Sequence, residues 1–291
     1  MRRSATTRAV LGLLLNSGIV RALTVPASPI EMMRRAADAV ARASEAGVSR
    51  QIVQIIVPED ERTYKVFGMV EIEGTSAPQD LDPWPGGLKQ QYPIALSLCK
   101  KMLQRVTGAD DNSINDQVLD AEDACGLVLA QGATPAKDVA CALFVGTDQM
   151  DELSRLDAMA DGRLLCLVNP QFKRMEDFSL WQRGKARSAY FERGYEVAYA
   201  FEEFACRGED VKLVGEFGEG WQAFVVLDDT TNEALPLHNS CLPERPDYKW
   251  LEAQINEQHP QPRWARMLND VDEKGLRFMR GEGATDSAGP P

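Results

Sequence analysis

Three short apolar runs in the middle of the sequence constrain the fold most. They read CGLVLA, VACALFVG and RLLCLVNP, and none of them alternates polar with apolar residues. Such runs, when turn residues bound them, are typical of strands that are buried on both faces of a sheet. Between the second and third runs, TDQMDELSRLDAMADG predicts a helix that is capped by Thr147 and ends at Gly162. A strand, a helix and a strand of these lengths predict a right-handed crossover between two parallel strands.

The segment before these runs predicts a helix, a strand and a second helix. At 28–31, SPIE combines a hydroxyl cap, a proline at the first helical position and a glutamate three residues after the cap, which is a capping box. That helix should end near Gly47. RQIVQIIVP at 50–58 predicts a strand, and YKVFGMVEI offers a further short one. The second helix is expected over 88–106, with Pro93 near its first turn, where the missing N–H costs least.

The last third of the chain predicts an antiparallel meander and then one short helix. YEVAYAFEEFAC, VKLVGEF and WQAFVVLDD are consecutive strand-like runs with short turns between them. RPDYKWLEAQINEQ predicts the helix, and GEGATDSAGPP predicts a disordered end. We therefore expect an α/β fold in one domain over residues 28–260: a mixed sheet with a parallel βαβ core, flanking helices and a C-terminal antiparallel meander. Residues 261–291 would be a polar C-terminal extension, largely disordered at its end.

The first residues differ in kind from the rest of this acidic chain. Residues 1–22 carry four arginines and no acid, and their apolar stretch at 9–20 is too short to span a membrane. The arginines, serines and threonines favour an organelle presequence, whereas the apolar middle also fits a signal peptide. A composite of both is what plastid import through an outer secretory membrane needs. We expect residues 1–27 to be a plastid targeting presequence, with an ordinary buried first helix as the alternative.

Charge and cysteine content exclude several classes of protein. The net charge of -12 argues against a nucleic-acid-binding protein, which would present a basic face. The six cysteines form no CxxC pair, and most of them lie within apolar runs, where a cysteine is more often a small buried hydrophobe than a ligand. With only two histidines as well, we expect no metal site and no cofactor.

The stretch LDPWPGGLKQQYPIA at 81–95 has two interpretations. Bare glycine N–H groups before a helix can bind an anion. However, a P-loop needs GxxxxGK[ST], and the lysine here has neither that glycine spacing nor an adjacent hydroxyl. A rigid turn, with its tryptophan packed as a plug, is the favoured interpretation. As a ligand or partner loop, the stretch would use the following residues: Asp82, Trp84, Pro85, Gly86, Gly87, Lys89 and Gln90.

Polar residues also follow several predicted strands. In open α/β sheets, ligands bind outside the carboxyl ends of the parallel strands. Glu59 and Asp60 follow the first strand, and Thr147 and Asp148 follow ALFVG. The step Asn169, Pro170 and Gln171 follows LLCLV. Asn169 can cap neighbouring backbone and Gln171 can bridge to another loop, although an amide pair would also suit a small polar ligand.

One cluster of acids stands apart from these strand ends. LDAEDACG contains Asp120, Glu122 and Asp123, and grouped carboxylates can do acid/base work or hold a divalent cation. Without a second motif that completes such a site, a solvated turn is the favoured interpretation.

Taken together, five segments resemble one known family. GVSRQIVQIIVPE, LDPWPGGLKQQY, LDAEDACGLVLA, LLCLVNPQF and RPDYKWLE, in this order and spacing, resemble the plastid family DUF1995 over residues 28–255. In that family the domain occurs alone or fused to an adenylate kinase domain, and this chain, which has no kinase P-loop, resembles the stand-alone form. The sequence departs from the family at GEFGEGW, where relatives tend to carry a proline before the tryptophan.

The resemblance implies a function rather than a reaction. Family members are linked to photosystem II biogenesis, and the family offers no catalytic residue to transfer. The implied protein is a non-catalytic auxiliary or assembly factor in the plastid stroma or at the stromal thylakoid surface. Its partners would be photosystem II assembly components or other thylakoid proteins, with no nucleic acid and no transmembrane segment, and peripheral membrane contact is left open.

The alternative is an enzyme or sensor that binds a nucleotide or a phosphorylated metabolite at the strand ends. In it, Gly86, Gly87 and Lys89 would receive the anion. Asn169 or Gln171 would then bind the polar body of the ligand.

Overall fold

The computed structural model describes residues 22–57, 87–228, 233–266 and 268. Three predicted features lie wholly or mostly outside these residues: the presequence up to residue 21, the short strand YKVFGMVEI and the disordered end of the chain. Residues 22–27, which we assigned to the presequence, lie against the domain. Leu23 is buried, and the carbonyl of Thr24 accepts a hydrogen bond of 2.6 Å from Nη1 of Arg35.

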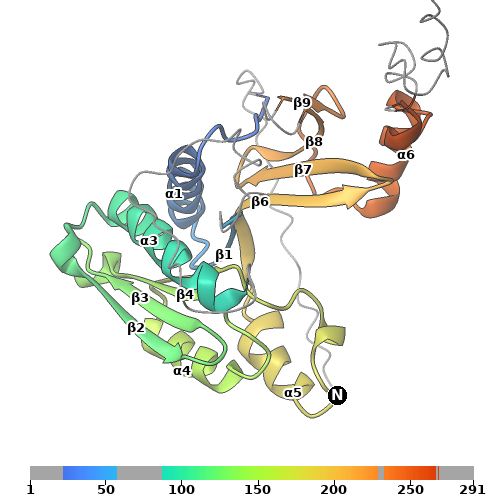
Figure 1. Ribbon diagram of the computed structural model, residues 1–291. Coiled ribbons are helices and arrows are strands. Elements are labelled where there is room, and N and C mark those ends of the chain that lie inside the picture. Colours follow the sequence, from blue (N-terminus) through green and yellow to red (C-terminus); the bar gives the residue numbers. More distant parts are fainter. Residues whose placement is uncertain (1–21, 58–86, 229–232, 267, 269–291) are drawn as a thin grey trace, which may run out of the picture.

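The described residues form one mixed sheet with helices on both faces (Figure 1). The strands are β1 (Arg50–Gln54), β2 (Ile114–Asp120), β3 (Cys125–Ala130), β4 (Val139–Leu143), β5 (Leu164–Val168), β6 (Glu196–Cys206), β7 (Glu209–Glu216), β8 (Gly220–Asp228) and β9 (Glu233–Pro236). The helices are α1 (Pro29–Glu45), α3 (Leu88–Thr107), α4 (Met150–Ala160), α5 (Arg183–Ala186) and α6 (Tyr248–Gln258). Short 3-10 turns lie at Asp111–Ser113, Pro135–Lys137 and Met175–Asp177, and a π turn, Arg187–Phe191, continues α5.

The strand order is β2-β3-β4-β5-β1-β6-β7-β8-β9. The predicted parallel pair is confirmed, because β4 and β5 are parallel and α4 connects them. β1 pairs in parallel with β5 on one side and with β6 on the other, so four parallel strands form the centre of the sheet. The predicted meander is confirmed as β6, β7 and β8, which pair antiparallel.

Both edges of the sheet differ from the expectation. β2 and β9 extend the sheet in antiparallel pairing, and the sequence analysis predicted neither. In β2, Ile114 is buried but the next four residues are exposed, and exposed edge strands lack the apolar pattern by which a buried strand is recognised. β3 pairs antiparallel with both of its neighbours, so it is not part of the parallel core.

The helix boundaries follow the predicted signals with two corrections. α1 has the predicted cap: Oγ of Ser28 accepts from the N–H of Glu31 at 3.1 Å, and Pro29 is its first residue. α4 begins at Met150 rather than after Thr147, because Oε1 of Gln149 accepts the N–H of Gly146 at 2.9 Å and closes a turn first. Pro93 is the sixth residue of α3, so it lies beyond the first turn, where a proline removes one helical hydrogen bond.

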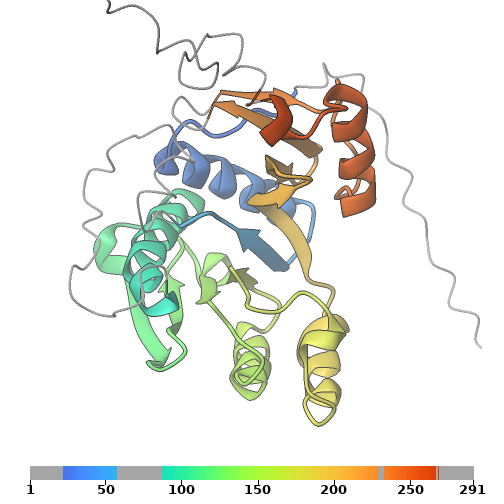
Figure 2. The ribbon, with the colours of Figure 1, turned by 45° about the vertical axis from the view of Figure 1, so that its right-hand side comes forward.

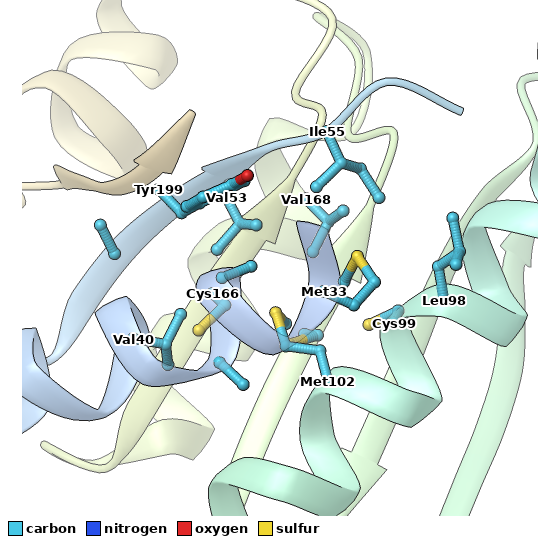
Figure 3. Close-up of a cluster of buried hydrophobic side chains, with 14 of the residues drawn as sticks. Met33, Val40, Val53, Ile55, Leu98, Cys99, Met102, Cys166, Val168 and Tyr199 are labelled. Atoms are coloured by element: carbon cyan, nitrogen blue, oxygen red, sulfur yellow. The ribbon is translucent and has the colours of Figure 1, made fainter. Parts of the chain in front are cut away.

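α1 and α3 pack against one face of the sheet over a core that is rich in sulfur (Figure 3). Met33 comes from α1, Cys99 and Met102 come from α3, and Cys166 comes from β5. The predicted burial of the cysteines is confirmed for Cys99, Cys125, Cys141, Cys166 and Cys206, whereas Cys241 is partly exposed.

A buried ion pair fastens α1 to the end of β7. Nε of Arg35 lies 2.6 Å from Oε1 of Glu216, and Nη2 of Arg42 lies 3.0 Å from Oε2 of the same carboxylate. Removing one partner from such a cluster leaves an uncompensated charge in a buried place, which is strongly destabilising. The pair therefore fixes α1 over the junction between the parallel and antiparallel parts of the sheet.

The opposite face of the sheet is covered in two separate places. α4 and α5 pack over β3, β4 and β5 through one apolar cluster, and α6 packs over β6, β7 and β8 through another. Figure 2 shows α5 and α6 apart, with the strands of the sheet between them.

Candidate functional site

Most of the predicted ligand loop lies outside the described residues. This holds for Asp82, Trp84, Pro85 and Gly86. Gly87 is the N-cap of α3 with a φ of -69°, a conformation that any residue adopts, so this glycine is not required by its backbone geometry.

Lys89 and Gln90 lie in the first turn of α3, and Lys89 is close enough to the turn between β2 and β3 for its charge to act on Asp120. The acidic cluster of the sequence forms that turn. Hydrogen bonds from the backbone N–H groups of Asp123 and Glu122 lower the pKa of Asp120, and the charge of Lys89 lowers it further. Lys89 therefore lies within electrostatic reach of a carboxylate, which works against the binding of an anion there.

Asn169 continues the parallel ladder between β5 and β1 with its side chain. Its Oδ1 accepts from the N–H of Ile55 at 2.8 Å, and its Nδ2 donates to the carbonyl of Ile55 at 2.9 Å. Its φ of +49° is in the left-handed region, which asparagine tolerates better than most residues. Both polar ends of the amide are thus engaged by the fold, in the capping role that the sequence suggested.

Gln171 joins the same edge of the sheet to the loop after β4. Its N–H donates to the carbonyl of Val145 at 2.9 Å, and its Nε2 donates to the carbonyl of Asn169 at 2.7 Å. The structure therefore places Asn169 and Gln171 together at the carboxyl ends of the parallel strands. Pro170, between them, lines a neighbouring groove.

That groove lies on the sheet face between α5 and α6, and we call it the α5–α6 groove. It has a volume of about 520 Å³. Side chains of β1, β6 and β8 form its floor: Ile52, Gln54, Val197, Glu202 and Trp221. The chain between β5 and β6 and the loop before α6 form its walls: Pro170, Phe172, Lys173, Arg174, Asp177, Tyr190 and Arg245.

A paired carboxylate occupies one end of the floor. Oε1 and Oε2 of Glu202 accept from Nε and Nη2 of Arg245 at 3.1 and 2.8 Å, and Nζ of Lys173 lies 3.5 Å from Oε2. Burial raises the pKa of Glu202, but the hydrogen bonds and charge of Arg245, with the charge of Lys173, outweigh it and hold this pKa below its usual value. Glu202 is therefore ionised at neutral pH and orients Arg245 across the groove.

Cations exceed carboxylates along the groove. Lys173, Arg174 and Arg245 face two acids, of which Glu202 is paired as described. The other acid, Asp177, accepts the backbone N–H groups of Lys173 and Arg174 at 2.7 and 2.8 Å, and these bonds lower its pKa. The groove thus has one more positive than negative charge, within a chain whose net charge is -12.

Trp221 is held in the floor by two glycines. A Cβ on Gly215, its cross-strand neighbour, would come within 2.6 Å of the indole ring. Gly220, which precedes the tryptophan, has a φ of +96°, and a Cβ there would lie 2.4 Å from the carbonyl oxygen of Leu242. Proline cannot adopt this φ, so the turn before Trp221 needs glycine.

Aromatic rings make the wall next to α5 rigid. The rings of Phe172 and Phe178 lie 5.0 Å apart between centroids, and those of Phe172 and Tyr190 lie 4.8 Å apart. Tyr195 stacks on Tyr190 at 5.1 Å. Burial raises the pKa of Tyr190 to about 12, so its hydroxyl stays protonated at neutral pH. The arrangement can hold a ligand that joins an apolar or aromatic part to an anionic group.

Among the predicted site residues that the structure describes, only Pro170 lines this groove. The sequence analysis missed Lys173, Arg174, Glu202 and Arg245. A signal was present, because KR follows NPQF directly and an arginine begins RPDYKW. Glu202 lies in a strand run that was interpreted as sheet core, where nothing local marks it as the partner of an arginine 43 residues later.

A family comparison covers this whole region. The family model described as "Domain of unknown function (DUF1995)" matches residues 26–253. The chain belongs to this family. The matched span contains every residue that lines the α5–α6 groove, so the groove is part of the DUF1995 domain itself. Comparisons with curated proteins and with solved structures found no match.

The described part of the DUF1995 chain lacks two further features, a membrane-spanning helix and a cluster of metal-binding side chains. None of its described helices is both long and apolar enough to cross a membrane. No group of three or more His, Cys, Asp or Glu side chains in those same residues is placed to hold a metal ion.

Proposed function

We propose that this DUF1995 protein is a non-catalytic plastid factor that assists photosystem II biogenesis by binding a client protein in the α5–α6 groove. The plastid and photosystem parts of the proposal rest on the family resemblance and on the arginine-bearing, acid-free start of the sequence. The α5–α6 groove is the observation that supports the binding of a client protein.

The groove suits a segment of polypeptide for three reasons. Its floor is open sheet surface between two covered regions, and it carries the apolar side chains Ile52, Val197 and Trp221. Its walls are held rigid by packed rings, so little order has to be gained when a partner binds. Tryptophan, tyrosine and arginine are also the residues that most often dominate binding energy at protein interfaces.

The cations of the groove add a preference for an acidic or carboxylate-bearing client. Lys173 and Arg174 are exposed beside the apolar floor. A client segment with an acidic residue next to an aromatic or aliphatic one would match both features.

Charge reversal tests this proposal. The double variant Lys173→Glu, Arg174→Glu should recover fewer photosystem II assembly intermediates in affinity purification from isolated plastids, and photosystem II should accumulate less. The control is Lys101→Glu, a single charge reversal on the exposed side of α3, on the opposite face of the sheet. If the groove variant recovers the same partners as the control, the groove is not the client site.

A second candidate function is the binding of a phosphorylated metabolite in the same groove. Its volume of about 520 Å³ falls in the range of small-molecule sites, and its excess of positive charge favours an anion. A thermal-shift screen over nucleotides and sugar phosphates separates the two candidates. A ligand at a hundred times its Kd would stabilise the protein by about 2.7 kcal/mol, and a wild-type shift that Arg245→Gln abolishes would favour the metabolite.

A further inference from the structure

Glu202 sets the charge of the α5–α6 groove. Its carboxylate accepts both hydrogen bonds from Arg245 and lies 3.5 Å from Nζ of Lys173, so it compensates one of the two charges on these cations. The side chain of Glu202 is 12% exposed, whereas those of Lys173 and Arg245 are 63% and 43% exposed. A ligand that enters the groove therefore meets the two cations first, and the carboxylate lies beneath them.

A β-bulge brings Glu202 onto the groove face. Val197 and Glu202 are five residues apart on β6, and in a regular strand an odd spacing puts two side chains on opposite faces of the sheet. The register of β6 against β1 shifts between Val197 and Tyr199, which leaves one extra residue in β6. Val197 and Glu202 consequently both line the groove, whereas Tyr199 is buried in the core on the other face. Bulges that re-aim a side chain in this way are over-represented next to functional sites.

The charges that line the groove, with the acids bonded to its cations included, leave an excess of one positive charge. Three cations and two acids line it: Lys173, Arg174, Arg245, Glu202 and Asp177. Within the described part of the chain, no acid outside this set forms an ion pair with one of these cations. The acids that neighbour them in the sequence do not line the groove: Glu176, Glu244 and Asp247. Without Glu202 the excess would be two charges.

We propose that Glu202 is a specificity-determining residue, which restricts the groove to a single carboxylate beside an apolar side chain and selects against the dianion of a phosphate group. The inference rests on the proposed function, because it specifies the client segment that the groove binds. In an unmodified client, Asp, Glu or the C-terminus supplies such a carboxylate.

Charge complementarity is the physical reason for this preference. One carboxylate balances the excess charge of the groove. A phosphate group carries a charge of about -1.5 to -2 near neutral pH, so part of its charge would lose hydration without meeting an uncompensated cation. The rest of the chain, with a net charge of -12, offers no compensation on average. The same reasoning sets the groove against the phosphorylated metabolite of the second candidate function.

Calorimetric titration of the full chain with two probes that share an aromatic ring system tests the proposal. The probes are 1-naphthaleneacetate, which carries one negative charge, and 1-naphthyl phosphate, which carries two at about pH 8. At low salt, the wild type should bind the acetate at least as tightly as the phosphate. Glu202→Gln adds one positive charge with little change of shape. It should tighten the acetate about fivefold and the phosphate about twenty-fivefold, because each ligand charge gains the same factor.

A variant with the opposite change of charge gives an independent test. Arg174→Gln removes an exposed cation from the groove, so it should weaken the acetate about fivefold and the phosphate about twenty-fivefold. Lys101→Gln makes the same change of charge on α3, on the opposite face of the sheet, and should leave both dissociation constants unchanged. The effects of the groove variants should shrink at about 1 M salt, where charges are screened over about 3 Å.

Four results would overturn the proposal. They are tighter binding of the phosphate than of the acetate by the wild type, no binding of either probe to the wild type, an equal change or no change for both probes in Glu202→Gln, and equal effects of Arg174→Gln and Lys101→Gln. Circular dichroism of each variant separates a change of affinity from unfolding.

Failure of this inference and failure of the proposed function give different results. If a client is recovered through the groove but Glu202→Gln shifts both probes equally, the client site stands and Glu202 does not determine its charge specificity. If the probes behave as predicted but the groove variant Lys173→Glu, Arg174→Glu recovers the same partners as its control, the charge selectivity stands and the client site lies elsewhere.

Discussion

Asn169 lies where open α/β sheets bind ligands, yet its side-chain amide is hydrogen-bonded to the protein backbone. It follows a buried parallel strand at the carboxyl edge of the sheet, and both of its polar atoms bond to the backbone of Ile55. Its neighbour Gln171 lies at the same edge and is exposed. At the scale of single residues, position in the sheet marks a candidate, and the hydrogen-bond partners decide what the residue does.

This role predicts a large effect of Asn169 on stability. Asn169→Ala removes two hydrogen bonds to the Ile55 backbone. It also places alanine at a positive φ, where it lacks the side-chain hydrogen bonds by which asparagine tolerates this conformation. The free energy of unfolding should therefore fall by about 2–3 kcal/mol. Asn169→Gly, which relieves the backbone, should lose about 1–2 kcal/mol. Urea unfolding measures both. The control Gln171→Ala should lose about 0.5 kcal/mol or less, and an equally small loss for Asn169→Ala would contradict this role.

At the scale of elements, α1 shows what local sequence can specify. Its cap, its proline and its acidic first turn were all predicted. One detail differs: Oε2 of Glu31 accepts from the N–H of Ala27 at 2.9 Å rather than from that of the cap residue. The helix start is thus fixed by side chains within five residues of one another, which is why a sequence pattern can find it.

The cap also gives the sharpest stability test of this element. Ser28→Ala should lower the free energy of unfolding by about 1 kcal/mol, because the N–H of Glu31 loses its acceptor. The same substitution in the last turn of α1, Ser44→Ala, has no cap to remove and should change stability by about 0.5 kcal/mol or less. Equal effects at both serines would show that the cap contributes nothing to stability.

Elements that depend on distant partners could not be predicted in the same way. The parallel pair of β4 and β5 was predicted, because both strands are buried and one helix joins them. The place of β1 between β5 and β6 was not, since it rests on pairing with strands more than 100 residues away. The α5–α6 groove was missed for the same reason: Pro170, Glu202 and Arg245 meet only after the sheet has formed.

At the scale of the whole molecule, the buried thiol of Cys125 and the buried hydroxyl of Tyr190 make the protein less stable at alkaline pH. Burial, with the nearby carboxylates of Asp120 and Asp123, raises the pKa of Cys125 from 9.0 to about 12. Burial likewise raises the pKa of Tyr190 from 10.0 to about 12. The unfolded chain loses these protons first, so the stability that they contribute is fully present below about pH 9 and is lost between about pH 9 and pH 12.

A comparison with Cys125→Ala isolates the thiol. The variant lacks the alkaline loss that Cys125 causes, so the difference in free energy of unfolding between wild type and variant should shift in favour of the variant as pH rises above about 9. Urea unfolding at about pH 8 and at about pH 10.5 measures the shift. A difference that is the same at both pH values would show that the thiol ionises alike in the folded and unfolded chains.

The central proposal is that the α5–α6 groove binds the client, and site-specific photo-cross-linking tests it most directly. A photoreactive amino acid would replace Lys173 at the groove in one protein and Lys101 on α3 in the other, two exposed lysines on opposite faces of the sheet. We predict that position 173 forms an adduct with a photosystem II assembly component in isolated plastids and that position 101 does not. Adducts from position 101 alone, equal adducts from both positions, or no such adduct from position 173 would contradict the account.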